Sequence, residues 1–121
     1  MRELVQRYLN AAKGKDIQAL DGIFTQDAVY IETNGATYTN LAQIKQWFEK
    51  LTRDGSVTAW DIRKVVCDGE NAAVQWYYEY RSNTGECVSR DGAALIEISD
   101  CKIKRWSEFS QTVNKTYPYQ V

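Results

Sequence analysis

The sequence contains no histidine, the side chain that proteins use most often as a general base near neutral pH and as a metal ligand. Acid–base chemistry would therefore fall to carboxylates, tyrosines or lysines. Disulfides and zinc sites are disfavoured as well, because Cys67, Cys87 and Cys101 are an odd number of widely spaced residues without a Cys-x-x-Cys pair. We expect three reduced thiols, and neither a cofactor nor a metal.

An excess of charge of one sign is also lacking. The 15 lysines and arginines nearly balance the 16 aspartates and glutamates, so no basic field favours nucleic acid or an anionic membrane. No apolar run approaches the roughly 18 residues that span a bilayer, and the N-terminal MRELVQRY lacks the apolar centre of a signal peptide. We expect a cytoplasmic protein whose partners include neither nucleic acid nor a membrane.

The chain also has only one proline and no linker, repeat or low-complexity segment. Its 121 residues suffice for one apolar core and are too few for two, so we expect a single domain over residues 1–121. The one proline, Pro118, lies in the last nine residues, which we expect to form a loosely held tail.

The sequence does show a change in the spacing of its apolar residues along the chain. Apolar residues first recur at helical spacing, and after Gly55 they alternate with polar ones as in strands. The predicted helices run over residues 2–13, from Asp16 to about residues 20–23, and over residues 41–52, where Asn40 and Gln43 form a capping box and Trp47 lies on the apolar face. The predicted strands run over about residues 27–33, 56–67, 72–82, 86–99 and 102–112.

This order of elements predicts an α+β fold in which a curved antiparallel β-sheet wraps around three N-terminal helices, as a cone-shaped α+β barrel. Such a sheet leaves a concave interior, and small-molecule sites favour apolar cavities with a few inward polar groups. Side-chain parity indicates which residues point inward. The predicted lining joins Tyr8 of the first helix with Tyr30 and Glu32, Trp47, the row Trp76, Tyr78 and Tyr80, and Trp106 with Glu108 and Ser110.

A carboxylic acid in such a cavity loses hydration, so its pKa rises toward the range useful for proton transfer at neutral pH. A buried tyrosine can donate to an oxygen that gains negative charge. Simpler interpretations stay open, because Glu32 can be solvated at a turn, Tyr8 can be plain core, and the aromatic row can be core packing. A register slip would turn Glu108 outward toward Lys104 or Arg105.

Arg90 and Asp91, which precede Gly92, fit either a bulge or a charged rim.

Two segments resemble a known family. VQRYLNAAKGKDIQALDGIFTQDAVYIET is similar to the opening of ketosteroid isomerases and their relatives in the nuclear transport factor 2-like, or SnoaL-like, superfamily. IEISDCKIKRWSEFS is similar to the ending of many SnoaL-like proteins and of limonene-epoxide hydrolases. The resemblance implies the cone-shaped fold, a homodimer through the sheet face, and a cavity for a small hydrophobic molecule.

The resemblance also implies roles for single residues. Tyr8 falls where the isomerases keep the tyrosine that hydrogen-bonds the substrate oxygen, and Glu32 where they keep the proton-shuttling aspartate. Glu108 falls where the epoxide hydrolases keep an aspartate that helps to activate water. The isomerases' second donor falls near Ala93 or Ala94, and the hydrolases' arginine and aspartate fall at Trp76 and Tyr78, so neither catalytic set is complete.

Three hypotheses follow. The first is a cofactor-free isomerase, cyclase, dehydratase or hydrolase, with Glu32 as base, Tyr8 as oxyanion donor, Glu108 as second acid or base, and the aromatic residues around the substrate. The second is a module that binds a small molecule without reaction. The third is an association domain that pairs through the outer sheet face, which includes Ala73, Tyr77, Ala93 and Leu95.

Overall fold

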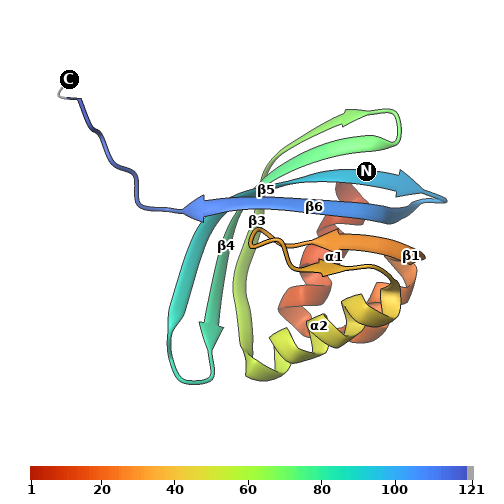
Figure 1. Cartoon of the computed structure of the whole chain (residues 1–121), viewed down its shortest axis with the longest axis horizontal. Coiled ribbons are helices and arrows are strands. Elements are labelled where there is room, and N and C mark those ends of the chain that lie inside the picture. The colour runs from red at the N-terminus through yellow and green to blue at the C-terminus, as the bar shows by residue number, and fades with distance from the viewer. Residues whose placement is uncertain (120–121) are drawn as a thin grey trace.

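The computed structural model describes residues 1–119, and residues 120–121, the end of the predicted tail, lie outside the described part. Residues 113–119 form no helix or strand and extend away from the body of the protein (Figure 1). In chain order the elements are α1 (Arg2–Gly14), the 3₁₀ helix η1 (Ile17–Gly22), β1 (Phe24–Ile31), β2 (Thr37–Tyr38), α2 (Leu41–Asp54), β3 (Gly55–Asp68), β4 (Asn71–Ser82), β5 (Cys87–Ser99) and β6 (Lys102–Thr112).

The three helices form where the apolar spacing predicts them. Asp16 accepts a hydrogen bond from the backbone N–H of Ala19 and so caps η1. Asn40 accepts one from the N–H of Gln43 at 2.9 Å, while the Gln43 side chain reaches back to the N–H of Thr39 at 2.8 Å. These two bonds satisfy backbone donors that the start of α2 would otherwise leave unpaired.

The six strands form one sheet in the order β2-β1-β6-β5-β4-β3. All neighbours are antiparallel except β1 and β6, which run parallel. Figure 1 shows the sheet curving over α1 and α2 without closing, so the predicted α+β cone is confirmed. The first strand begins earlier than expected, at Phe24, because Phe24 already pairs with Ile103. It also ends earlier, at Ile31, so Glu32 lies in the turn that follows.

The core lies between the helices and the concave face of the sheet. Its largest fully buried side chains include Trp106, Tyr8, Tyr30, Phe24 and Phe48. These come from α1, β1, α2 and β6, so one apolar cluster joins both layers.

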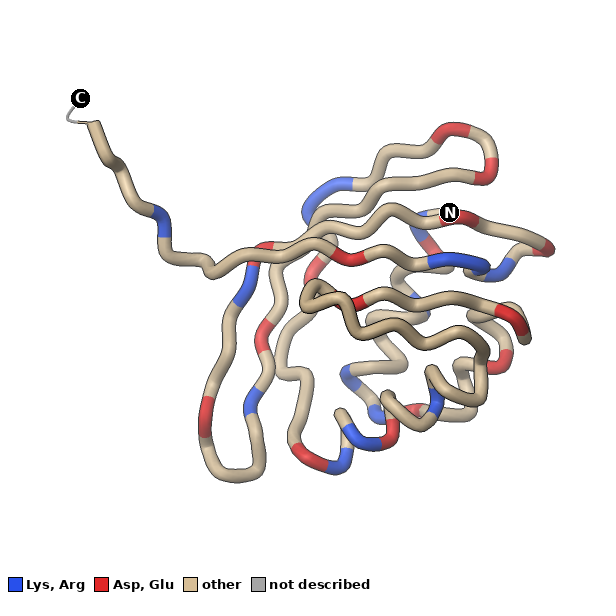
Figure 2. Tube along the Cα trace, in the orientation of Figure 1, with Lys and Arg blue, Asp and Glu red and all other residues tan. Residues whose placement is uncertain are grey.

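Charged residues of both signs are distributed along the described chain. Figure 2 shows Lys and Arg interspersed with Asp and Glu along the trace. No helix within residues 1–119 is long and apolar enough to cross a bilayer. The three cysteines are exposed and unpaired in the described part of the chain.

Candidate functional site

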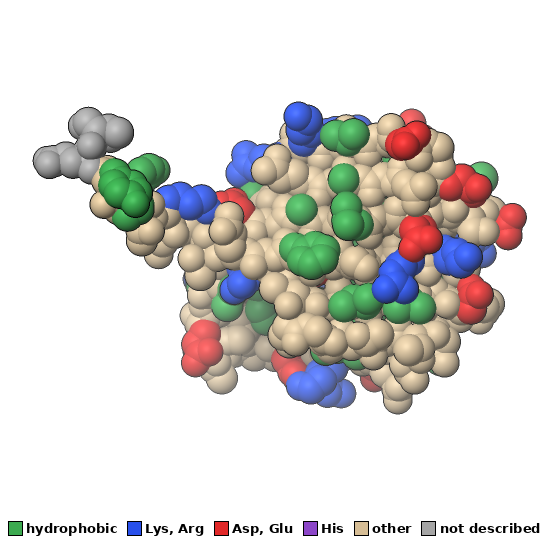
Figure 3. All heavy atoms as spheres, turned by 45° about the horizontal axis from the view of Figure 1, so that its top comes forward, with side chains coloured by type: hydrophobic (Ala, Val, Ile, Leu, Met, Phe, Trp, Pro, Cys, Tyr) green, Lys and Arg blue, Asp and Glu red, His purple; other side chains and the backbone are tan. Residues whose placement is uncertain are grey.

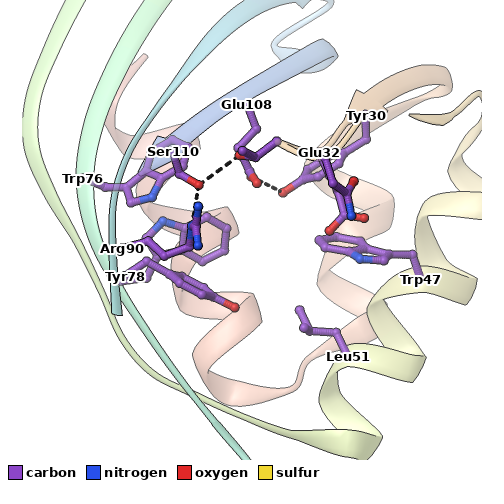
Figure 4. Close-up of a pocket in the computed structure, with 12 residues that line it drawn as sticks. Tyr30, Glu32, Trp47, Leu51, Trp76, Tyr78, Arg90, Glu108 and Ser110 are labelled. Atoms are coloured by element: carbon purple, nitrogen blue, oxygen red, sulfur yellow. Dashed lines mark hydrogen bonds between the residues drawn. The ribbon is translucent and has the colours of Figure 1, made fainter. Parts of the chain in front are cut away.

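A cavity of about 330 Å³ opens where the concave face of the sheet meets α2 and the turn after β1 (Figure 4). This volume lies at the lower end of the roughly 300–1,000 Å³ found for small-molecule sites. Aromatic side chains form most of the wall, and carboxylates, hydroxyls and one guanidinium interrupt it. The lining residues are Tyr30, Glu32, Thr33, Asn34, Trp47, Leu51, Trp60, Trp76, Tyr78, Arg90, Glu108 and Ser110.

Glu108 reaches the cavity because of the parallel pairing of β1 with β6. Tyr30 lies opposite Trp106 in this register, and their rings stack with centroids 5.6 Å apart. Glu108 follows Trp106 by two positions and therefore lies on the same face of β6. Its Oε1 accepts one hydrogen bond from the Tyr30 hydroxyl and another from the Trp106 indole N–H, both at 3.1 Å.

Removal from water raises the pKa of the Glu108 carboxyl above its ordinary value. The hydrogen bonds from Trp106 and Tyr30 act in the opposite direction because they stabilise the carboxylate, and the nearby charge of Glu32 adds to the rise. Loss of hydration dominates, so this carboxyl holds its proton to higher pH than an exposed glutamate. The register also excludes the interpretation in which Glu108 faces outward.

Glu32 lies at the cavity wall, in the turn that joins β1 to β2. The turn is closed by the N–H of Glu32, which donates to the carbonyl of Ala36 at 2.9 Å. The Tyr38 hydroxyl donates to Oε2 of Glu32 at 2.8 Å. Burial and this hydrogen bond raise the pKa of Tyr38 to about 12. Glu32 is partly exposed and lines the same cavity as Glu108, so the two carboxyls face a common space.

Tyr8 lies behind the cavity wall. Its side chain is fully buried, and its hydroxyl donates to the Tyr30 hydroxyl at 2.7 Å. Burial raises the pKa of Tyr8 well above its ordinary value. A chain of hydrogen bonds thus runs from Tyr8 through Tyr30 to Glu108, and the Tyr8 hydroxyl is linked to the cavity through Tyr30. A direct contact between Tyr8 and a ligand stays a prediction and would require Tyr30 to move.

The other predicted lining residues divide into two groups. Trp47, Trp76 and Tyr78 line the cavity, with Tyr30. Tyr80 lies outside the lining, where its hydroxyl donates to the backbone carbonyl of Leu51 at 2.7 Å, and Trp106 lies beneath Glu108.

Gly92 leaves room for the Trp76 indole at the cavity wall. The two residues pair across β4 and β5, and a Cβ atom built on Gly92 would lie 2.5 Å from the indole nitrogen of Trp76. The indole therefore lies flat over the backbone of β5, where any larger residue would displace it.

Sequence reasoning did not identify several lining residues. Arg90 was left open as a bulge or rim residue, and the structure shows its side chain in the cavity, with Nε donating to the Ser110 hydroxyl at 2.7 Å. Trp60 was missed because β3 has register shifts on both sides of it, which obscure the alternation. Thr33 and Asn34 follow β1 in the turn, where parity makes no prediction, and Leu51 was placed only on the apolar face of its helix.

Within residues 1–119, no group of three or more Asp, Glu and Cys side chains is arranged to hold a metal ion.

Comparisons with known proteins agree with this architecture. The family model of the SnoaL-like domain matches residues 5–106. A solved protein from Catenulispora acidiphila, with a ketosteroid isomerase-like fold and in complex with trimethylamine, is 21% identical, with a TM-score of 0.80 over 92% of this chain and 86% of that one. An LEH-like epoxide hydrolase of M. tuberculosis is 16% identical, with a TM-score of 0.81 over 90% of this chain and 80% of that one.

A protein from Sinorhizobium meliloti assigned to the polyketide cyclases is 25% identical, with a TM-score of 0.71 over 88% of this chain and 93% of that one. These structures show a shared fold. Among curated proteins the sequence has no match.

Proposed function

The chain belongs to the SnoaL-like domain family, and we propose that it is a cofactor-free acid–base catalyst, an isomerase, cyclase, dehydratase or hydrolase, that acts on a small hydrophobic molecule. The observation that carries the proposal is the placement of two carboxyls, Glu32 and Glu108, on one largely aromatic cavity. Burial raises the pKa of Glu108 above its ordinary value, which is the direction that suits a carboxyl acting as a proton donor.

The two carboxyls have different surroundings and so suit different roles. Glu108 is poorly hydrated and holds its proton to higher pH, which favours the role of general acid. Glu32 is partly exposed and is held by the Tyr38 hydroxyl, which favours the role of base. Two carboxyls with environments this unequal are a common basis for dividing acid and base functions.

The phenol of Tyr78, across the cavity from Glu32, is the third polar group of the proposed site (Figure 4). Within residues 1–119, the hydroxyl of Tyr78 is not hydrogen-bonded to another side chain, and Figure 4 shows it directed toward the space in front of Leu51. Tyr78 can therefore donate to a ligand oxygen, whereas Tyr8 and Tyr30 already donate within the protein. In this proposal Tyr8 is a positioning residue that holds Tyr30 against Glu108.

Related structures support acid–base chemistry of this breadth. Solved proteins with this fold include an epoxide hydrolase and a protein assigned to the polyketide cyclases. Since the same fold supports several reactions, the carboxyls and not the fold define the chemistry here.

Proton exchange tests the proposal without knowledge of the natural substrate. The protein would be incubated in D₂O with 2-tetralone, a small apolar ketone, and deuterium uptake next to the carbonyl followed by NMR. We expect the wild type to accelerate deuterium uptake and Glu32→Gln to lower the accelerated rate by about 100-fold or more. Glu49→Gln, whose side chain is exposed on α2, should exchange at the wild-type rate. Equal rates for the wild type and Glu32→Gln would contradict the proposal.

The second candidate is a binding module, favoured by the incomplete match to both known catalytic sets. Such a protein would melt at a higher temperature with 2-tetralone, would keep that shift in Glu32→Gln, and would exchange no protons.

A further inference from the structure

The cavity contains one cation, Arg90, whose role the acid–base proposal does not explain. Arg90 lies on β5 between Tyr78 of β4 and Thr112 of β6, and its partly buried side chain points into the cavity (Figure 4). It is the only lysine or arginine among the lining residues.

Arg90 forms no ion pair with a carboxylate of the described residues. Its neighbour Asp91 pairs instead with Lys115 at 2.8 Å. The Nε–H of Arg90 donates a hydrogen bond to the hydroxyl oxygen of Ser110. The Ser110 hydroxyl is also hydrogen-bonded to the Thr33 hydroxyl at 3.0 Å.

This arrangement leaves the outer part of the guanidinium available. Arginine has five N–H donors in a planar fork, and the bond to Ser110 uses the one on Nε. The Ser110–Thr33 pair fixes the orientation of the fork from behind. A planar, oriented fork binds a carboxylate through two parallel hydrogen bonds, and its strength increases in a poorly hydrated cavity.

A second donor lies in the same row of the sheet. Trp60 of β3 pairs with Tyr78, which pairs with Arg90, so the three residues are successive neighbours across the strands. Within the described residues the indole nitrogen of Trp60 is the one buried side-chain nitrogen or oxygen without a hydrogen-bond partner. Trp60 and Arg90 can only donate, whereas the carboxyls of the cavity, Glu32 and Glu108, lie in the turn after β1 and on β6.

We infer that the ligand of this cavity is a small apolar molecule that carries a carboxylate, and that Arg90 binds this carboxylate. The inference rests on the proposed function in one respect, that a small hydrophobic molecule occupies the cavity. The carboxylate on Arg90 directs the rest of the molecule toward Glu32 and Glu108.

Equilibrium binding of three matched probes tests the inference. The probes are 1-naphthylacetate, its neutral amide 1-naphthylacetamide, and the cation 1-naphthylmethylammonium, each titrated by calorimetry at pH 7.5. We expect the acid to bind about tenfold more tightly than the amide, or better, and the cation to bind most weakly. A cavity that prefers the amide or the cation would overturn the inference.

Variants then assign the preference to Arg90. Arg90→Gln should remove the preference for the acid over the amide while amide binding persists, and Arg90→Lys should restore part of it. The control is Arg63→Gln, which removes an exposed arginine that lies over the ring of Tyr77. Equal effects of Arg90→Gln and Arg63→Gln would overturn the inference.

Two further results keep the outcome decisive. Ser110→Ala frees the fork from its support, so it should weaken acid binding more than amide binding even where Arg90→Gln does not fold. Binding of the amide without preference for the acid would refute the inference about Arg90 alone. Binding of no probe would refute the inference and also the proposed function.

Discussion

Tyr30 donates its hydroxyl proton to Glu108, 78 positions later in the chain, at 3.1 Å. The contact depends on the one parallel pairing in the sheet, which sets Tyr30 beside Trp106 and so brings Glu108 over the end of the phenol. It also links the cavity to the core, because Tyr30 accepts the hydroxyl proton of the fully buried Tyr8. The candidate acid is therefore held by a hydrogen-bond chain that begins in the buried core.

Removing the hydroxyl of Tyr30 should destabilise the protein more than removing the hydroxyl of Tyr8. Tyr30→Phe leaves the buried hydroxyl of Tyr8 without an acceptor and should lower the free energy of unfolding by about 1–3 kcal/mol. Tyr8→Phe should cost less, about 0.5–1.5 kcal/mol, because Tyr30 still donates to Glu108. Urea unfolding measures both, and a larger loss for Tyr8→Phe would contradict the direction of the hydrogen-bond chain.

The pKa of Glu108 predicts a dependence of stability on pH. Because folding raises this pKa, the folded state favours the protonated carboxyl, and its contribution is fully present below the ordinary value near 4.3. The contribution falls as pH rises through the folded pKa, by about 1.4 kcal/mol for each pH unit between the ordinary and folded values. Glu108→Gln should lack this decline, so the stability difference between variant and wild type should grow from pH 4 upward and then level off.

Gly92 should tolerate no larger residue. In Gly92→Ala the new methyl group would overlap the Trp76 indole, which cannot retreat because it packs against Trp106 with centroids 5.5 Å apart. We expect a loss of about 1–3 kcal/mol in unfolding free energy and weaker binding of 1-naphthylacetamide. Gly14→Ala is the matched control, since a Cβ there meets no neighbour within 4 Å. Similar losses in both variants would show that Gly92 is not needed for packing.

The outer face of the sheet supports a prediction about association. Val66 pairs with Ala73, which pairs with Leu95, in one row, and Ala93 pairs with Phe109 in another, so apolar side chains adjoin across four strands. Figure 3 shows hydrophobic side chains gathered over this face, and Leu95 and Phe109 are 59% and 62% exposed. A patch of this kind is typical of an interface.

We expect the protein to form a homodimer through this face. Leu95→Lys should then shift the mass measured by light scattering from dimer to monomer, because it places a charge inside the interface. Ala42→Lys, on the exposed side of α2, should leave the mass unchanged. A wild type that is monomeric at all concentrations would rule out this use of the face.

The sequence predicts those parts of the fold that depend on local periodicity. The apolar spacing of α1 and α2 and the alternation along β4 locate these elements within two residues. The two-residue strand β2 is too short to produce a pattern, and its pairing with β1 draws the Tyr38 hydroxyl onto Glu32. The parallel pairing of β1 with β6 is not encoded locally, so the contact of Tyr30 with Glu108 could not be predicted.

The candidate site likewise has residues that the sequence predicts and residues that it does not. Parity placed Trp76, Tyr78 and Glu108 on the inner face because β4 and β6 are regular where these residues lie. Arg90 shares the inner face with Gly92, but a charged residue is more often solvated than turned inward. The structure shows that it lines the cavity and bonds to Ser110 on the neighbouring strand.

The most direct test of this account is the titration of Glu108 itself. In protein labelled with ¹³C at the glutamate side-chain carboxyls, the Glu108 resonance is the one missing from the spectrum of Glu108→Gln. The account predicts that its chemical shift titrates with a pKa above the ordinary value of about 4.3, because the carboxyl lies in a poorly hydrated cavity. A pKa at or below that value would show a hydrated carboxylate and would contradict the proposed acid.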